Sequence, residues 1–219
     1  MRLLAHLISI VFHPLLILTY LLLLILVVNP YMFGYGRVGE ADQLILMVFL
    51  TSVLIPLIAI LVMMGIGWVQ SLQMSDRHER IGPYLVTSVL YLSLYLHLAK
   101  TKSFPPLILI VTLGAVIALF LGFFVNNFRK ISMHAISIGG FLLALVLLYY
   151  KYSTDHFMFP LSRLYDLQIP TVYLVYIAIL AAGLVCSARL VLGKHSPAEV
   201  YLGFVVGVGS MSIAYWALG

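Results

Sequence analysis

The sequence predicts an all-α integral membrane protein, a polytopic helical bundle of six to seven transmembrane helices. Hydrophobic residues make up 63% of the 219 residues and charged residues only 9%, and the mean hydropathy is +1.14. A soluble domain has about 25% charged residues, so this chain has too little polar surface to stay in water. No linker is long enough to separate two units, and we expect a single domain over residues 1–219.

Seven apolar segments support this fold class. A helix needs about 20 apolar residues to cross the hydrocarbon core, and five of the segments reach that length easily. The third and the fifth are short, which leaves tilted, re-entrant and partly protein-buried helices open. In chain order the segments are 3–28, 44–70, 84–99, 105–125, 134–151, 170–190 and 197–218.

The first segment follows Met1-Arg2, as the apolar part of a signal peptide would. Its apolar run is longer than the about 7–15 residues of a signal-peptide core, and no small-residue cleavage site follows it. We therefore expect a retained anchor and a multi-pass protein of the cell (inner or plasma) membrane.

The last segment carries a stripe of small residues, Gly203, Gly207 and Gly209. Such a stripe lets a neighbouring helix approach closely. Packing within the chain is the favoured interpretation and a dimer interface is the alternative, so the oligomeric state stays open.

The composition also excludes several functions. The net charge is +5, but the basic residues are scattered singly between apolar runs. A nucleic-acid site needs a clustered basic stripe, and we expect no nucleic-acid partner. The single cysteine, Cys186, rules out an internal disulfide and every cysteine-based metal motif.

Polar residues gather in three clusters. The first lies in "SDRHERIGP" at 75–83, the second in "FRKISMH" at 128–134, and the third in "SARLVLGKHSPAEVYLG" at 187–203. Two apolar segments separate each cluster from the next, and an even number of crossings returns the chain to the same membrane face. The clusters are therefore expected to form one composite site at the ends of packed helices.

The chemistry of the clusters indicates an anion site. Arginines offer paired donors that match phosphate oxygens, and two histidines can supply a nucleophile and a proton donor. Carboxylates are too few for a two-metal site. Ser196-Pro197 is typical of a helix start, and a helix N-terminus just after His195 favours an anion there.

These residues resemble the type 2 phosphatidic acid phosphatase family, the lipid phosphate phosphatases. The family's third motif is Ser-Arg, five residues, His, three residues, Asp; here the spacing is kept by Ala188-Arg189, His195 and Glu199. The second motif, Pro-Ser-Gly-His, corresponds to residues 131–134, which keep the serine and the histidine. The first motif, Lys, six residues, Arg-Pro, is matched poorly by "SLQMSDRHERIGP". The resemblance covers a phosphatase-like core at about 70–210.

The resemblance implies a hydrolase of phospholipid metabolism that needs neither metal nor cofactor. It implies that His195 attacks phosphorus to form a phosphohistidine, that Glu199 holds the imidazole in the nucleophilic tautomer, and that His134 protonates the leaving oxygen. The expected substrate is phosphatidic acid, phosphatidylglycerol phosphate or an isoprenyl pyrophosphate. The phosphoryl oxygens would be bound by Arg189, by Ser132 and by an arginine of the first cluster, either Arg77 or Arg80.

Three alternatives stay open. Glu199 could complete a capping box with Ser196 and only stabilise the helix start. The departures from the motifs could mark a family member that binds lipid or another anion without turnover. A haem held by His134 and His195 is the third alternative, which nothing else in the sequence favours. The basic residues divide almost evenly between the two faces, so the side of the membrane that the site faces also stays open.

Overall fold

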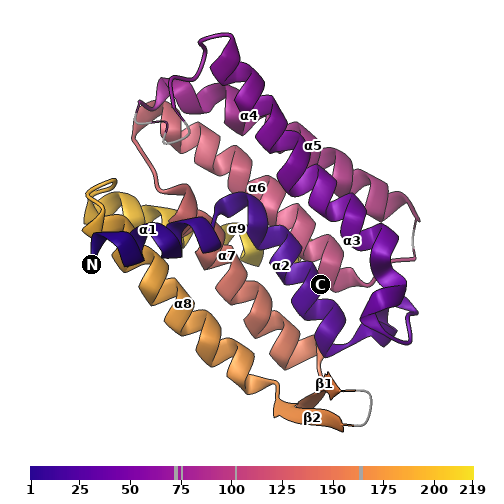
Figure 1. The fold of residues 1–219 in the computed structure, drawn as a ribbon. Coiled ribbons are helices and arrows are strands. Elements are labelled where there is room, and N and C mark those ends of the chain that lie inside the picture. Colours follow the sequence, from indigo (N-terminus) through magenta and orange to yellow (C-terminus); the bar gives the residue numbers. More distant parts are fainter. Residues whose placement is uncertain (72–73, 75, 102, 163–164) are drawn as a thin grey trace.

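The structure is a computed structural model, and it describes residues 1–71, 74, 76–101, 103–162 and 165–219. In these residues nine α-helices form a bundle, and a β-hairpin lies between the seventh and the eighth (Figure 1). The strands are β1 (His156–Ser162) and β2 (Tyr165–Pro170), which pair in antiparallel fashion. The helices are α1 (Arg2–Val11), α2 (Pro14–Val28), α3 (Asp42–Phe49), α4 (Ile55–Gly65), α5 (Ile81–Thr101), α6 (Pro106–Phe128), α7 (Met133–Leu147), α8 (Val172–Val191) and α9 (Pro197–Leu218).

The predicted fold class is confirmed. Six helical segments of the described chain are long and apolar enough to cross a membrane, and the bent pair α1–α2 makes a seventh if it counts as one span. The two segments that are short in the sequence gain length in the structure. Helix α5 has 21 residues, and α7 continues through a π-helical turn to Tyr152, which gives 20 residues in all.

The first predicted segment is not one straight helix. Helices α1 and α2 meet at an angle of 58°, with the break at Phe12 and His13. Proline lacks an N–H and disfavours helical backbone in the residue before it, so Pro14 ends α1 and starts α2. His13 is the N-cap of α2, where its Nδ1 accepts a hydrogen bond from the N–H of Leu15 at 3.4 Å.

Helices α7 and α9 pack closely at glycines. A methyl group on Gly207 would collide with the backbone oxygen of Ile136, and one on Gly203 would lie 2.7 Å from the backbone oxygen of Ser132. A methyl group on Gly209 would meet nothing within 4 Å. The small-residue stripe therefore packs within the chain at Gly203 and Gly207, as predicted.

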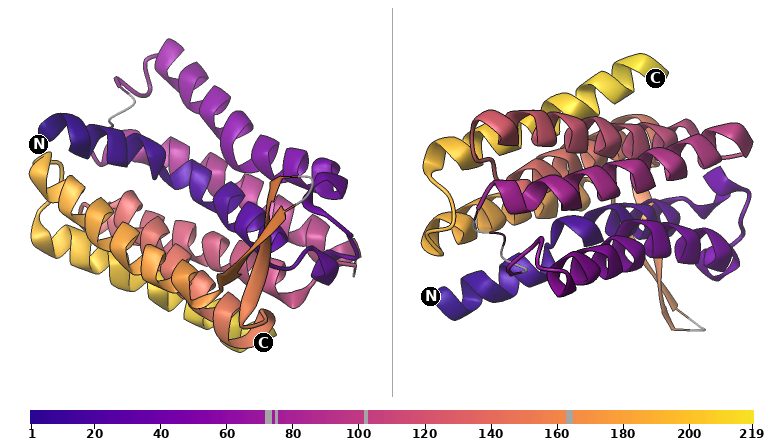
Figure 2. Two further views of the ribbon diagram at one scale, coloured as in Figure 1. Left: turned by 60° about the horizontal axis from the view of Figure 1, so that its bottom comes forward. Right: turned by 90° about the horizontal axis from the view of Figure 1, so that it is seen from above.

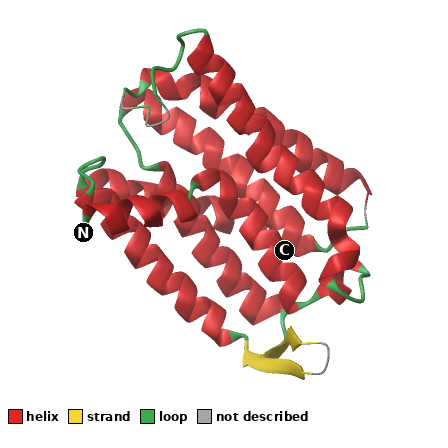
Figure 3. Ribbon diagram, viewed as in Figure 1, coloured by secondary structure: helices red, strands yellow, loops and turns green. Residues whose placement is uncertain are grey.

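The bundle has two distinct ends. The N-terminus and the connections α4–α5, α6–α7 and α8–α9 lie at one end, on the left of Figure 1. The hairpin and the C-terminus lie toward the other end (Figure 2). The sequence predicts no helix between the apolar segments that end at 151 and begin at 170, and the structure forms the hairpin there (Figure 3). All three polar clusters thus lie at the N-terminal end, as the count of crossings predicts.

Candidate active site

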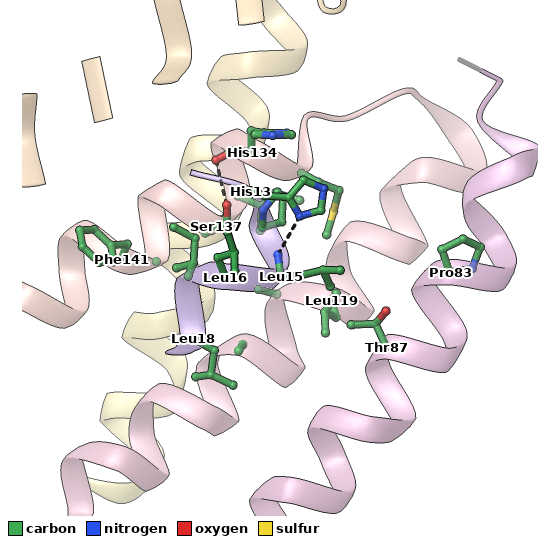
Figure 4. A pocket seen from close by; sticks show the side chains of 18 of the residues that line it. His13, Leu15, Leu16, Leu18, Pro83, Thr87, Leu119, His134, Ser137 and Phe141 are labelled. Atoms are coloured by element: carbon green, nitrogen blue, oxygen red, sulfur yellow. Dashed lines mark hydrogen bonds between the residues drawn. The ribbon is translucent and has the colours of Figure 1, made fainter. Parts of the chain in front are cut away.

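A cavity of about 650 Å³ runs from the N-terminal end of the bundle into its interior. Its body is apolar and is lined by side chains of several helices, among them Leu18, Leu57, Leu119 and Phe141. Figure 4 shows Leu18, Leu119 and Phe141 around this space. Its head is lined by charged and titratable side chains from all three polar clusters: Arg80, His134, Arg189 and His195. The predicted convergence of the clusters is confirmed for these four residues.

His195 and Glu199 form a hydrogen-bonded pair. Nδ1 of His195 lies 2.8 Å from Oε2 of Glu199, and the two side chains are 3% and 19% exposed. An ionised carboxylate can only accept, so Nδ1 carries the proton and Nε2 of the neutral ring keeps its lone pair. Ser196 caps α9 by accepting the N–H of Glu199 at 3.4 Å. The Glu199 carboxylate itself bonds the imidazole, so the capping-box alternative holds only for Ser196.

The surroundings of His195 favour its neutral form. Burial lowers the pKa of His195 below its usual 6.5, and the nearby charges of Arg189, Arg80 and Lys130 lower it further. The hydrogen bond to Glu199 acts in the opposite direction but does not reverse the shift. The Nε2 lone pair is therefore available at neutral pH.

Two arginines at the head of the cavity have no carboxylate partner within the described part of the chain. Arg80 is 9% exposed and donates from Nε to the oxygen of Met74 at 2.9 Å and from Nη1 to that of Ile131 at 3.1 Å. Arg189 donates from Nη1 to Oγ of Ser9 at 3.3 Å, and its buried Nε has no hydrogen-bond partner among the residues that the structure describes. Burying a charge without an ion of opposite sign in direct contact costs free energy, so this arrangement suits a bound anion.

The structure distinguishes the two arginines of the first cluster. Arg80 lines the cavity. Arg77 is exposed and donates from Nη1 to the backbone oxygens of Asn127 and Phe128, at 3.3 and 3.2 Å, and it does not line the cavity. Of the two candidates, Arg80 is therefore the one placed to contact an anion beside His195.

The second cluster divides in the same way. His134, in the first turn of α7, lines the cavity, and its Nε2 lies 3.0 Å from the carbonyl oxygen of Ser9. Ser132 is fully buried outside the cavity lining. Its Oγ caps α7 by accepting the N–H of Ala135, and its own N–H donates to the backbone oxygen of Glu199, each at 3.4 Å. A phosphate contact by Ser132 stays a prediction, while its observed contacts join the starts of α7 and α9.

Ser9 and His13 are residues of the cavity head that the sequence motifs do not predict. Both line the cavity, and the His13 ring lies edge-on to that of His134 at 5.6 Å between centroids (Figure 4). In the sequence, these two residues stand out only as polar side chains four positions apart in an apolar segment, the second directly before a proline.

The described residues contain no group of three or more His, Cys, Asp or Glu side chains arranged to hold a metal ion. The cavity head offers N–H donors in excess over carboxylates, with Glu199 as the carboxylate that contacts His195. Such a donor set matches an anion in preference to a cation.

The fold and the site together define a polytopic helical bundle of the membrane-protein type, with an apolar cavity whose head is rich in hydrogen-bond donors. The family model of the PAP2 superfamily matches residues 122–219, in agreement with the resemblance drawn from the motifs. The match supports a phosphatase-type function. No curated protein and no solved structure matches the chain. The matched segment contains the second and third clusters, whereas the first cluster, with Arg77 and Arg80, precedes it.

Proposed function

We propose that the protein is a membrane lipid phosphatase that hydrolyses a phosphomonoester or pyrophosphate of a lipid through a phosphohistidine intermediate, without a metal. The observation that carries the proposal is the His195–Glu199 pair at the head of an apolar cavity. It lies beside Arg80 and Arg189, which contact no carboxylate among the described residues.

In the first step, Nε2 of His195 attacks phosphorus and the bond from phosphorus to the lipid oxygen breaks. The attacking ring becomes positively charged, and the Glu199 carboxylate on Nδ1 stabilises that charge. Arg80 and Arg189 bind the phosphoryl oxygens, on which negative charge accumulates in the transition state. In the second step, the oxygen of a water molecule attacks phosphorus while a water proton returns to the general acid described below. The bond from phosphorus to Nε2 breaks, which releases phosphate and restores neutral His195.

His134 is proposed to protonate the leaving lipid oxygen. Its Nε2 donates to the carbonyl oxygen of Ser9 in the structure, and the ring would act as the general acid in its protonated, imidazolium form. For proton transfer from this nitrogen, the leaving oxygen has to replace the Ser9 carbonyl. A general acid in hydrogen-bond reach contributes about 10²–10⁴-fold to a rate.

The body of the cavity supports a substrate with an apolar tail. Side chains of α2, α4, α6, α7 and α9 line it, and most are aliphatic or aromatic. A hydrocarbon chain in this space would be held below a phosphate at the polar head. Phosphatidic acid, phosphatidylglycerol phosphate and isoprenyl pyrophosphates all have this form.

The test is release of phosphate from these three lipids by purified protein in detergent with a chelator present. We expect release from at least one of them, and loss of release in His195→Ala with the fold intact. Full activity in His195→Ala would exclude the proposed nucleophile. Activity that disappears with the chelator and returns with a divalent metal would exclude the metal-independent step.

The second candidate function is binding of a lipid or other anion without turnover. It is favoured by the contacts of Ser9, which engages both His134 and Arg189 in the structure, and by the alanine and methionine at positions 188 and 133 of the motifs. This candidate predicts that orthovanadate or a lipid phosphate raises the melting temperature while none of the three lipids releases phosphate.

A further inference from the structure

His13 lies at the break between α1 and α2 and has no part in the reaction proposed above. It is exposed and lines the cavity, and Figure 4 shows its ring next to that of His134. The rings are nearly perpendicular, at 84°, with centroids 5.6 Å apart. His13 therefore lies at the polar head of the cavity, among the groups that would surround a phosphate.

The cap of α2 sets the tautomer of His13. Nδ1 accepts the N–H of Leu15 at 3.4 Å, so the lone pair is on Nδ1 and the proton of the neutral ring is on Nε2. The hydrogen bond from Leu15 to Nδ1 thus caps α2 and also leaves Nε2, on the opposite edge of the ring, as a hydrogen-bond donor. That edge belongs to a side chain exposed to the cavity.

The residue one helical turn earlier supports the same view of the break. The backbone oxygen of Ser9 accepts a hydrogen bond from Nε2 of His134 at 3.0 Å, and its Oγ accepts one from Nη1 of Arg189 at 3.3 Å. Ser9 and His13 thus bring the N-terminal helix pair into contact with His134 and Arg189, two of the residues assigned to the proposed reaction. This wall of the cavity lies outside the segment that matches the family model.

We propose that His13 is a substrate-binding residue of this site, whose Nε2–H donates to an oxygen of the bound phosphate ester. The inference rests on the proposed function for the identity of the ligand. His13 would add a neutral donor to the two arginines. The break between α1 and α2 would then belong to the site and contribute to the affinity for the phosphate ester.

The test separates the ring from the cap. Asparagine and serine are good N-cap residues, so His13→Asn and His13→Ser keep the start of α2 but remove the Nε2 donor. The matched control is His97→Asn, an exposed histidine of α5 that does not line the cavity. We expect both His13 variants to keep the wild-type melting temperature and to lose kcat/KM by about tenfold or more, as a lost hydrogen bond to a charged group predicts, with His97→Asn unchanged.

Orthovanadate binding, measured as a rise in melting temperature, distinguishes failure of this inference from failure of the proposed function. In one outcome, the wild type releases no phosphate, and vanadate raises the melting temperature of the wild type but not of the His13 variants. This would support His13 as an anion ligand and refute the proposed phosphatase activity. Wild-type kcat/KM and wild-type protection in both His13 variants would overturn the inference and leave the phosphatase standing. A wild type that neither hydrolyses nor binds vanadate would overturn both.

Discussion

Replacing Glu199 by glutamine tests the central contact of the site. The carboxylate of Glu199 accepts the Nδ1 proton of His195 at 2.8 Å, and the imidazole is 3% exposed. Glutamine has the same length, so it can keep the hydrogen bond but loses the negative charge. The variant therefore isolates the electrostatic part of the interaction.

The magnitude follows from the type of hydrogen bond. A hydrogen bond to a charged group contributes about 1.5–3 kcal/mol, and a neutral one about 0.5–1.5 kcal/mol. The difference of about 1–1.5 kcal/mol corresponds to a decrease of about tenfold in kcat, because each decade of rate costs about 1.4 kcal/mol. If the amide instead presents its NH₂ group to Nδ1, the ring proton moves to Nε2 and the nucleophilic lone pair is lost, so the decrease becomes larger.

The assay is release of phosphate from the best lipid of the panel, with the melting temperature measured on the same preparation. Ser196→Ala is the matched control, since it removes the cap of α9 and leaves the carboxylate in place. We expect Ser196→Ala to lose about 1 kcal/mol of stability and to keep its kcat. Glu199→Gln with wild-type kcat and reduced stability would refute the reasoning, because the carboxylate would then act only on the helix start.

The remaining predictions concern the titration of His195, the packing of α9 on α7 and the two arginines of the first cluster. Because the pKa of His195 is lowered from 6.5, the acid limb of kcat/KM due to the nucleophile should lie below pH 6.5, and a midpoint above that pH would contradict the assignment. Near pH 6.5 this histidine is protonated in the unfolded chain but stays neutral in the folded one. The neutral His195 should therefore stabilise the fold less and less as the pH falls from 6.5 toward the lowered pKa, and the melting temperature should fall with it. Gly207→Ala should lower the free energy of unfolding by about 1–3 kcal/mol, because the methyl group overpacks against α7. Gly209→Ala, in open space, should leave that free energy unchanged or raise it by up to about 1 kcal/mol through helix propensity. Equal stability of the two variants in a denaturing-detergent titration would contradict this. Arg80→Gln should lower kcat/KM by about 10–100-fold, because it removes a charged donor. Arg77→Gln should lower kcat/KM by no more than about twofold, because that side chain is exposed. A larger effect in Arg77→Gln than in Arg80→Gln would identify Arg77 as the arginine that binds phosphate.

The arrangement of the bundle could be predicted because it depends on coarse properties of the chain. Apolar length determines which segments form helices that can cross a membrane, and the number of crossings between two clusters determines whether they share a face. Neither property reveals the bend at Pro14, since hydropathy averaged over a window treats 3–28 as one run. The hairpin at 156–170 was missed for a related reason, because an interrupted apolar pattern between two helices is also typical of a loop.

Within the site, local contacts could be predicted and distant ones could not. His195 and Glu199 are four residues apart at the start of one helix, so their spacing alone brings them together. The choice of Arg80 over Arg77 depends on side-chain directions at the irregular end of a loop, which no periodicity determines. The contacts of Ser9 with His134 and Arg189 span 125 and 180 residues, and they depend on how α1 bends over α8.

The departures from the family motifs differ in their physical consequences. Glu199 in place of aspartate adds one methylene, about 1.5 Å of reach, and the 2.8 Å contact with His195 shows that the longer side chain still meets the ring. Alanine at 188 is buried, with 3% exposed, and Oγ of Ser9 contacts the neighbouring Arg189 from another helix. The chemistry proposed for this site therefore depends on Nε2 of His195 reaching phosphorus between Arg80 and Arg189, a condition of geometry that the altered motif residues leave in place.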